Sequence, residues 1–464
     1  MSTELHWLTL TELAAKLRAR EVSPVEATDA LLARIDALEP ALGAYVTVTT
    51  EYARGRARQA ESEIAAGRYL GPLHGVPIAV KDLCYTTFAP TSGGMAIHKD
   101  FIANENATVV DRLEAAGAVI LGKLKLTEGA YANHHPSVDP PNNPWDAGRW
   151  TGVSSSGSGV ATAAAMCFAS LGSDTGGSIR FPSAMNGVVG IKPTWGRVSR
   201  HAVFPLGLSL DHIGPMARSV ADAAAVLEVI AGRDPNDPTS LPAPVPPYGD
   251  ACARGVAGLR VGIDENFNTL GLDPEVAGLV AAAADVLRSL GAVTVPVHIP
   301  WDDGMAREWT RLCAAETALV HEDTFPARKD EYGPMLASFI ESGRNLSALE
   351  LARSTEVRRR FDGNLAAVFT DIDIVLCPSY GLATPPAERL PQERDTTGRG
   401  MRFTAPFDFS GSPTISIPCG FTNDGMPASL QLVGRHLGEE TLIAAASAYE
   451  AATGWQSRRP PLAP

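Results

Sequence analysis

The sequence predicts an α/β fold with a twisted, mixed or mainly parallel β-sheet and helices covering both faces. Two observations predict this class. From Leu73 onward, short apolar segments typical of buried strands alternate with segments of helical periodicity. The chain also has 464 residues, of which 45% are hydrophobic and 20% are charged, so it can bury a large core. Length alone allows two or three domains.

Two helix starts open the chain. Both Thr9–Glu12 and Ser23–Glu26 fit a capping box, and Pro24 suits a first helical position. Apolar residues follow at helical spacing, namely Leu10, Leu13, Leu17, Leu31, Leu32, Ile35 and Leu38. We expect residues 1–64 to form helices that wrap the core.

The later elements follow the same alternation. We expect helices at 108–116 and 160–170, and a mostly helical stretch at 303–369. The Pro-rich segment 234–250 is interpreted as a surface connection and not as an element. Buried strands are expected at 76–80, 119–121, 259–263, 372–376 and 414–417.

Composition excludes several classes of partner. The net charge of −13 and the pI of about 5.3 disfavour binding to nucleic acid or to anionic membranes through a basic surface. The six cysteines are dispersed without a C-x-x-C pair, which favours buried free thiols of a cytosolic protein. No signal peptide is visible at the start, and the apolar run 160–171 is shorter than a membrane span. We therefore expect a cytoplasmic protein.

The most informative stretch is 172–183, which reads Gly-Ser-Asp-Thr-Gly-Gly-Ser-Ile-Arg-Phe-Pro-Ser. Two glycines precede Ser178, so the backbone can bend tightly and present several N–H groups beside a hydroxyl. Acyl transfer needs such a nucleophile next to donors for a developing oxyanion. Alone the motif is only suggestive, because Gly-Gly-Ser also forms ordinary turns and flexible loops.

Two further motifs lie upstream. A serine cluster spans 152–159 and places Ser154 24 residues before Ser178, and the segment Gly75–Asp82 contains Lys81. This combination resembles the amidase signature family of serine hydrolases. The resemblance is strong over about residues 65–215, and it returns in the motifs at Phe403–Phe407 and Leu430–Gly434.

The resemblance implies a Ser-cisSer-Lys triad, with Ser178 as nucleophile, Ser154 as the serine of a cis peptide, and Lys81 as base. The family's Gly-Gly-Ser-Ser-Gly-Gly-Ser appears here as Gly-Val-Ser-Ser-Ser-Gly-Ser, so Val153 and Ser156 depart from the pattern. The spacing that assigns Ser154 is intact.

The same resemblance implies an oxyanion hole built from the backbone N–H groups of Thr175, Gly176, Gly177 and Ser178. Ser155 is expected to support the proton relay by hydrogen bonding.

The choice of Lys81 as base also has a chemical argument. None of the ten histidines lies in a recognisable triad motif. A lysine at its ordinary pKa of about 10.4 is a cation and cannot accept a proton, but burial lowers that pKa. Lys81 follows the apolar segment 76–80, which suits a partly buried position. The alternative is a surface lysine paired with Asp82. The adjacent pair His134 and His135 makes a poor metal site, since neighbouring residues point in different directions.

Residues around the triad carry weaker expectations. Asp174 and Arg180 flank the Gly-Gly-Ser loop and are interpreted as structural partners that hold it. By position in the family, Glu128 and Tyr131 should approach the acyl side. The loop 199–211 should border the cleft through Phe204, Pro205 and Leu206.

The resemblance implies one large α/β domain over residues 1–464. Its expected parts are N-terminal helices at 1–64, a signature core at 65–215, a helical lid-like insertion at 303–369, and the C-terminal part of the core at 370–464.

The function implied is that of an amidohydrolase that cleaves C–N bonds through a seryl acyl-enzyme, with no metal or organic cofactor. Its partners would be small-molecule amides, and also esters, anilides or carbamates as in urethanases. No nucleic-acid or membrane partner is expected, and the oligomeric state stays open, a homodimer included. One alternative is the glutaminase component of a glutamyl-tRNA(Gln) amidotransferase, which frees ammonia from glutamine with the same triad. A catalytically dead binding protein is a second alternative, and the intact triad positions argue against it.

Overall fold

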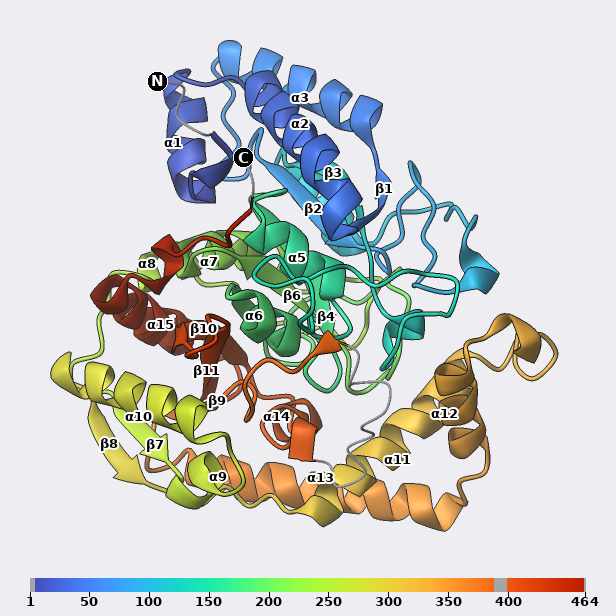
Figure 1. Cartoon of the computed structure of the whole chain (residues 1–464), viewed down its shortest axis with the longest axis vertical. Helices are drawn as coiled ribbons and strands as arrows, with labels where there is room; N and C mark the ends of the chain where they lie inside the picture. The colour runs from blue at the N-terminus through green and yellow to red at the C-terminus, as the bar shows by residue number, and fades with distance from the viewer. Residues whose placement is uncertain (1–4, 388–398, 463–464) are drawn as a thin grey trace.

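The computed structural model describes residues 5–387 and 399–462, and within them eleven strands form one sheet (Figure 1). Their order is β1-β3-β2-β4-β6-β5-β10-β11-β9-β7-β8. The strands are β1 (Tyr45–Val48), β2 (Pro77–Lys81), β3 (Val119–Leu124), β4 (Ala169–Asp174), β5 (Val189–Lys192), β6 (His212–Ala217), β7 (Arg260–Ile263), β8 (Val293–Pro296), β9 (Ile374–Pro378), β10 (Thr414–Phe421) and β11 (Pro427–Gly434).

The sheet is mixed, as the sequence predicts. Strand β2 runs parallel to both β3 and β4, and β7 runs parallel to both β8 and β9. The other neighbours are antiparallel. All five expected strands are present, although each differs from its expected bounds by a few residues.

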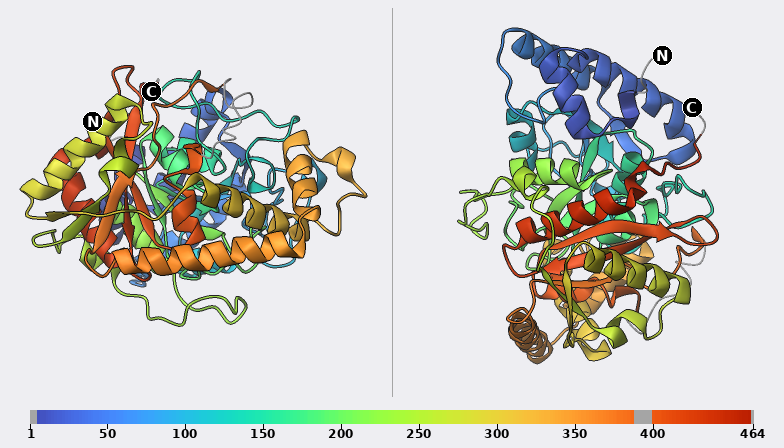
Figure 2. Two further views of the ribbon diagram at one scale, coloured as in Figure 1. Left: turned by 90° about the horizontal axis from the view of Figure 1, so that it is seen from below. Right: turned by 90° about the vertical axis from the view of Figure 1, so that its left-hand side faces the viewer.

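Helices cover both faces of the sheet. Every residue of β2, β3, β4, β6 and β11 is buried. Because successive side chains of a strand point to opposite faces, burial of all of them requires cover on both sides. Figure 2 shows helices on either side of the C-terminal strands. The helices are α1 (Leu10–Ala19), α2 (Pro24–Leu42), α3 (Thr50–Ala65), α4 (Thr108–Ala115), α5 (Ser156–Ala163), α6 (Arg180–Asn186), α7 (Val220–Ile230), α8 (Tyr248–Ala251), α9 (Glu265–Thr269), α10 (Pro274–Ser289), α11 (Asp303–Val320), α12 (Pro334–Arg344), α13 (Ala348–Val368), α14 (Ala405–Phe409) and α15 (Glu439–Thr453).

The N-terminal helices begin where the capping pattern predicts. Thr9 and Glu12 form a reciprocal capping box at the start of α1. The Ser23 hydroxyl accepts the Glu26 N–H, and Pro24 is the first residue of α2. The seven apolar residues expected to face the core are all buried.

The expected helix at 160–170 is wrong beyond Ala163. Helix α5 ends at Ala163, the backbone turns at Ala165 with a φ of 55°, and β4 begins at Ala169. An apolar run that is buried on every side carries no periodicity, so a helix and a buried strand look alike in it.

The segment 234–250 is also more ordered than a surface connection. The buried carboxylate of Asp234 accepts the Ser199 hydroxyl at 2.5 Å, and that of Asp237 accepts the Arg200 N–H at 2.9 Å. The short helix α8 begins at Tyr248.

The segment 303–369 is mostly helical, as expected. Its helices α11, α12 and α13 lie together at the lower right of Figure 1, and α11 packs against both of the others. All six cysteines are free thiols, and all except Cys252 are buried. No helix among the described residues is long and apolar enough to cross a bilayer.

Candidate active site

The three sequence motifs meet at one edge of the sheet. Strands β2 and β4 are parallel neighbours, so their carboxyl ends lie side by side. Lys81 is the last residue of β2, and β4 leads through the loop 175–179 into α6. The serine cluster precedes and begins α5, which packs against both strands.

Lys81 is fully buried among three serine hydroxyls. Its Nζ lies 2.7 Å from the Oγ of Ser154, 2.9 Å from that of Ser155 and 2.7 Å from that of Ser173. Among the described residues Lys81 forms no ion pair, because Asp82 pairs instead with Lys123 at 3.1 Å. The alternative of a surface lysine paired with Asp82 is therefore wrong.

The surroundings of Lys81 favour its neutral form. Burial lowers the pKa of the Lys81 amine to about 7, although the charge of Asp174 acts in the opposite direction. At neutral pH a substantial fraction of the amine can therefore accept a proton.

Ser154 and Ser155 are held by backbone contacts on both sides. The peptide bond between Val153 and Ser154 is cis, as the resemblance implies. The Ser155 hydroxyl donates to the carbonyl of Ser173 at 3.1 Å and accepts its N–H at 3.2 Å. The N–H of Ser155 donates to the carbonyl of Ser178 at 3.2 Å, which joins the serine cluster to the Gly-Gly-Ser loop.

Ser178 is half-buried at the end of this loop. Within the part of the chain that the structure describes, its hydroxyl makes no hydrogen bond. The structure thus brings Lys81 and Ser154 into direct contact and places the Ser178 backbone against Ser155. A hydrogen bond between the Ser154 and Ser178 hydroxyls stays a prediction.

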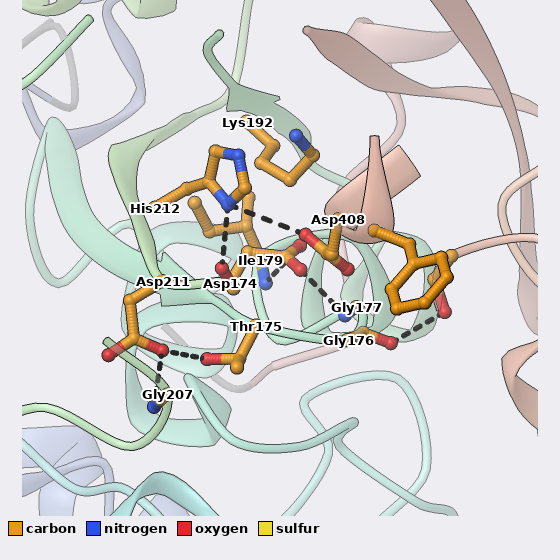
Figure 3. Close-up of polar contacts among 12 residues, drawn as sticks. Asp174, Thr175, Gly176, Gly177, Ile179, Lys192, Gly207, Asp211, His212 and Asp408 are labelled. Atoms are coloured by element: carbon orange, nitrogen blue, oxygen red, sulfur yellow. Dashed lines mark hydrogen bonds and ion pairs between the residues drawn. The ribbon is translucent and has the colours of Figure 1, made fainter. Parts of the chain in front are cut away.

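Some N–H groups of the loop bind the Asp174 carboxylate, and others have no partner in the described chain. The N–H groups of Gly177 and Ile179 donate to the Asp174 carboxylate at 2.6 and 3.0 Å (Figure 3). Those of Gly176 and Ser178 have no partner among the described residues. Of the expected oxyanion donors, the Gly177 N–H is thus occupied, while the N–H groups of Thr175, Gly176 and Ser178 make no hydrogen bond within the described residues. Thr175 is held by its hydroxyl, which donates to Asp211 at 2.5 Å.

Asp174 and Arg180 have the structural role that the sequence predicts. The two form a fully buried ion pair at 2.9 Å, and Arg180 also binds Asp408 at 2.6 Å. Although burial alone would raise the pKa of the Asp174 carboxyl, Arg180 and the loop N–H groups hold that pKa well below its usual range. Figure 3 shows Asp408 and His212 beside Asp174, with the Nδ1 of His212 3.5 Å from Asp408.

Glu128 and Tyr131 both contact the helical segment 303–369, and their approach to the acyl side of a substrate stays a prediction. Both carboxylate oxygens of Glu128 accept the N–H of Gly333, at 2.9 and 3.0 Å, just before α12. Burial raises the pKa of Glu128 to about 7. Tyr131 stacks on Phe339 of α12, with ring centroids 3.9 Å apart.

The loop 199–211 borders a cavity of about 310 Å³, as expected. Phe204, Pro205 and Leu206 line it from this loop, and Ser173 and Thr175 line it from the catalytic motif. Neither Lys81 nor Ser178 is among its lining residues, so the cavity borders the catalytic motif at Ser173 and Thr175.

The conspicuous histidine pair is engaged in local contacts. His134 lies 3.1 Å from the Ser156 hydroxyl, and His135 lies 2.7 Å from that of Ser137. Within residues 5–387 and 399–462, no group of three or more His, Cys, Asp or Glu side chains could hold a metal ion.

Sequence reasoning missed several residues of the site. Ser173 lies in the same motif as Ser178. It belongs to β4, where apolar and polar residues do not alternate, so no pattern distinguishes Ser173 from its neighbours. Asp408 comes from a distant segment, and no motif indicates the contact by which Trp309 donates its indole N–H to the Thr175 carbonyl at 3.1 Å.

Comparisons with known proteins agree on one family. The family described as Amidase matches residues 26–443. AmiD of Mycobacterium tuberculosis, described as a putative amidase, is 48% identical over 98% of this chain and 96% of its own length. A glutamyl-tRNA(Gln) amidotransferase chain of Chloroflexus aurantiacus is 38% identical over 99% of both chains. The structure of the peptide amidase from Stenotrophomonas maltophilia superposes with a TM-score of 0.86 and 32% identity, over 98% of both chains. The chain therefore belongs to the amidase family, the amidase signature hydrolases that act on carbon–nitrogen bonds.

Proposed function

We propose that the protein hydrolyses small-molecule amides with Ser178 as nucleophile and Lys81 as base, through Ser154. The observation that carries this proposal is the environment of Lys81: full burial, three hydroxyl neighbours and no carboxylate partner among the described residues. A neutral amine has two N–H groups and one lone pair. The three hydroxyl contacts use both N–H groups and the lone pair if the Lys81 amine donates to Ser155 and Ser173 and accepts from Ser154.

The first chemical step follows from this arrangement. As the Ser178 oxygen attacks the substrate carbonyl, its proton passes to Ser154, whose own proton passes to Lys81. The carbonyl oxygen becomes an anion, and in this proposal the unbonded N–H groups of Gly176 and Ser178 stabilise it.

The relay then runs in reverse. Lys81 returns its proton through Ser154 to the leaving nitrogen, the C–N bond breaks, and the amine departs from an acyl-enzyme at Ser178. A water molecule attacks the acyl carbonyl and gives its proton to the same relay. The carboxylic acid leaves and the Ser178 hydroxyl is restored.

We extend the proposed substrate class to esters, anilides and carbamates. Each has a carbonyl carbon and a leaving group that gains a proton as it departs, which is all that the relay acts on. The glutaminase reaction of a glutamyl-tRNA(Gln) amidotransferase is the second candidate, and the 38% identity to the Chloroflexus protein favours testing it.

We also propose a cytoplasmic location, which the six free cysteines support, because disulfides form in oxidising compartments. A homodimer is the assembly to test, by sedimentation of the purified protein.

One panel of substrates tests these proposals. Purified protein is assayed with an aryl amide, the matching ester, the matching carbamate and L-glutamine, and each assay is repeated with Ser178→Ala. Ser156→Ala is the control, because among the described residues the Ser156 hydroxyl forms a hydrogen bond only with His134. Turnover of the aryl amide that Ser178→Ala loses and Ser156→Ala retains supports the amidase. Release of ammonia from glutamine without turnover of the aryl compounds supports the second candidate, and no turnover of any compound contradicts both.

A further inference from the structure

A tryptophan of the helical segment holds the backbone of the catalytic loop. Trp309 of α11 is buried, and its indole N–H donates to the Thr175 carbonyl at 3.1 Å. Its ring also covers Gly176, since a Cβ added there would lie 2.6 Å from Cζ2 of the indole. Trp309 therefore contacts two successive residues of the loop, although it lies 134 positions from Thr175 in the chain.

The contact determines where the next N–H points. In a trans peptide group the carbonyl and the following N–H point in opposite directions. The bond between Thr175 and Gly176 is trans, since the cis bonds of the described residues lie at Val153–Ser154 and Phe325–Pro326. With its carbonyl held by Trp309, this group directs the Gly176 N–H to the opposite side, where no atom of the described residues accepts it.

The following peptide group is held from both ends. The Gly176 carbonyl accepts the Thr404 hydroxyl at 2.6 Å, and the Gly177 N–H donates to Asp174 at 2.6 Å. Of these two peptide groups, only Thr175–Gly176 has an N–H without a partner in the described chain. Trp309 is the side chain that holds this peptide group.

Helix α11 is itself fastened beside the site, so the indole is held in place. Thr317 donates its hydroxyl to the Leu206 carbonyl at 3.0 Å. Glu316 accepts the N–H of Ser209 at 3.0 Å and its hydroxyl at 2.5 Å. These contacts join α11 to the loop 199–211, which packs beside Thr175 through Asp211.

We propose that Trp309 is a positioning residue that aims the Gly176 N–H at the oxyanion of the tetrahedral intermediate. The inference rests on the proposed function, because an oxyanion forms only if Ser178 attacks a carbonyl. Without the indole N–H, the Thr175–Gly176 peptide group can rotate, and a donor that must reorient during the reaction stabilises the developing charge less. The helical segment then contributes to turnover itself and does more than cover the core.

Trp309→Phe tests this role, because it keeps an aromatic ring and removes the donor. Trp301→Phe is the matched control: Trp301 packs edge-to-face on Phe361 near the start of α11. We expect Trp309→Phe to lower kcat about tenfold, a fraction of the loss seen when an oxyanion donor is deleted. KM should stay within about twofold, since the ground-state carbonyl carries little charge. The pH at which activity is half-maximal should not move, because Lys81 is untouched.

Binding of phenylboronic acid gives a second readout, since it forms a tetrahedral anion on a nucleophilic serine. Its affinity should fall with kcat in Trp309→Phe and in Trp309→Leu, which both lack a donor, and not in Trp301→Phe. If one Trp309 variant melts below the assay temperature, the other provides the comparison. A kcat and boronate affinity within twofold of wild type, or equal losses in Trp301→Phe, overturn the inference while the proposed function stands. Wild-type protein that hydrolyses nothing in the substrate panel overturns both.

Discussion

The amine of Lys81 lies 2.7 Å from the hydroxyl of Ser154, and both side chains are buried. Lysine and serine are 73 residues apart in the chain, and a parallel strand pair together with the start of α5 brings them together. A buried amine among hydroxyls is poised to exchange a proton with them, and the first two predictions follow from this contact.

Replacing Lys81 should abolish turnover. We expect Lys81→Met to lower kcat/KM at least about a thousandfold, since it removes the only proposed acceptor for the Ser178 proton. Lys99→Met, at an exposed position, is the control and should behave as wild type. Steady-state kinetics on the folded variants measure this change in kcat/KM. A Lys81→Met variant with more than a tenth of wild-type activity would show that another group is the base.

Activity should rise with pH through about 7. Below its pKa the Lys81 amine is a cation without a lone pair, so kcat/KM should fall about tenfold per pH unit on the acid side and level off above about pH 8. Glu128 also has a pKa raised to about 7, so Glu128→Gln is the needed control. If kcat/KM of Glu128→Gln no longer falls at low pH, the pH dependence comes from the Glu128 carboxyl and not from Lys81.

Ser155 should matter for both rate and stability. Its hydroxyl contacts Lys81 and both backbone groups of Ser173. Ser155→Ala leaves buried polar groups without a partner, so we expect a loss of about 1–3 kcal/mol in the free energy of unfolding and a lower kcat. Denaturant titration and kinetics measure the two effects. Ser155→Ala with unchanged unfolding and unchanged kcat would contradict the hydrogen-bond network.

Asp174 should act through the loop and not through substrate. Asp174→Asn weakens the support of Gly177 and Ile179 and leaves Arg180 with Asp408 as its only carboxylate partner in the described residues. Breaking a buried ion pair costs about 3–5 kcal/mol, so thermal unfolding should occur at clearly lower temperature. An Asp174→Asn protein that melts with wild type but has lost activity would instead place Asp174 in the chemistry.

The parts of the site that lie within contiguous motifs can be predicted from the sequence. Local pattern and family resemblance identify the three proposed catalytic residues. Ser178 and Ser154 lie in glycine-rich segments, and Lys81 ends an apolar strand. Fully buried strands such as β4 carry no alternation, which is why the pattern predicts a helix where β4 begins and does not single out Ser173. Trp309 reaches Thr175 across 134 residues of chain and Asp408 reaches Arg180 across 228, and no local pattern encodes such contacts.

The central claim is that Ser178 attacks the substrate carbonyl, and covalent trapping tests it most directly. Protein treated with an aryl sulfonyl fluoride or rapidly quenched with an activated ester is digested, and the modified peptide is identified by mass spectrometry. We predict a single adduct on Ser178, absent from folded Ser178→Ala and strongly slowed in Lys81→Met. An adduct on another residue, or wild-type turnover by folded Ser178→Ala, would contradict the account.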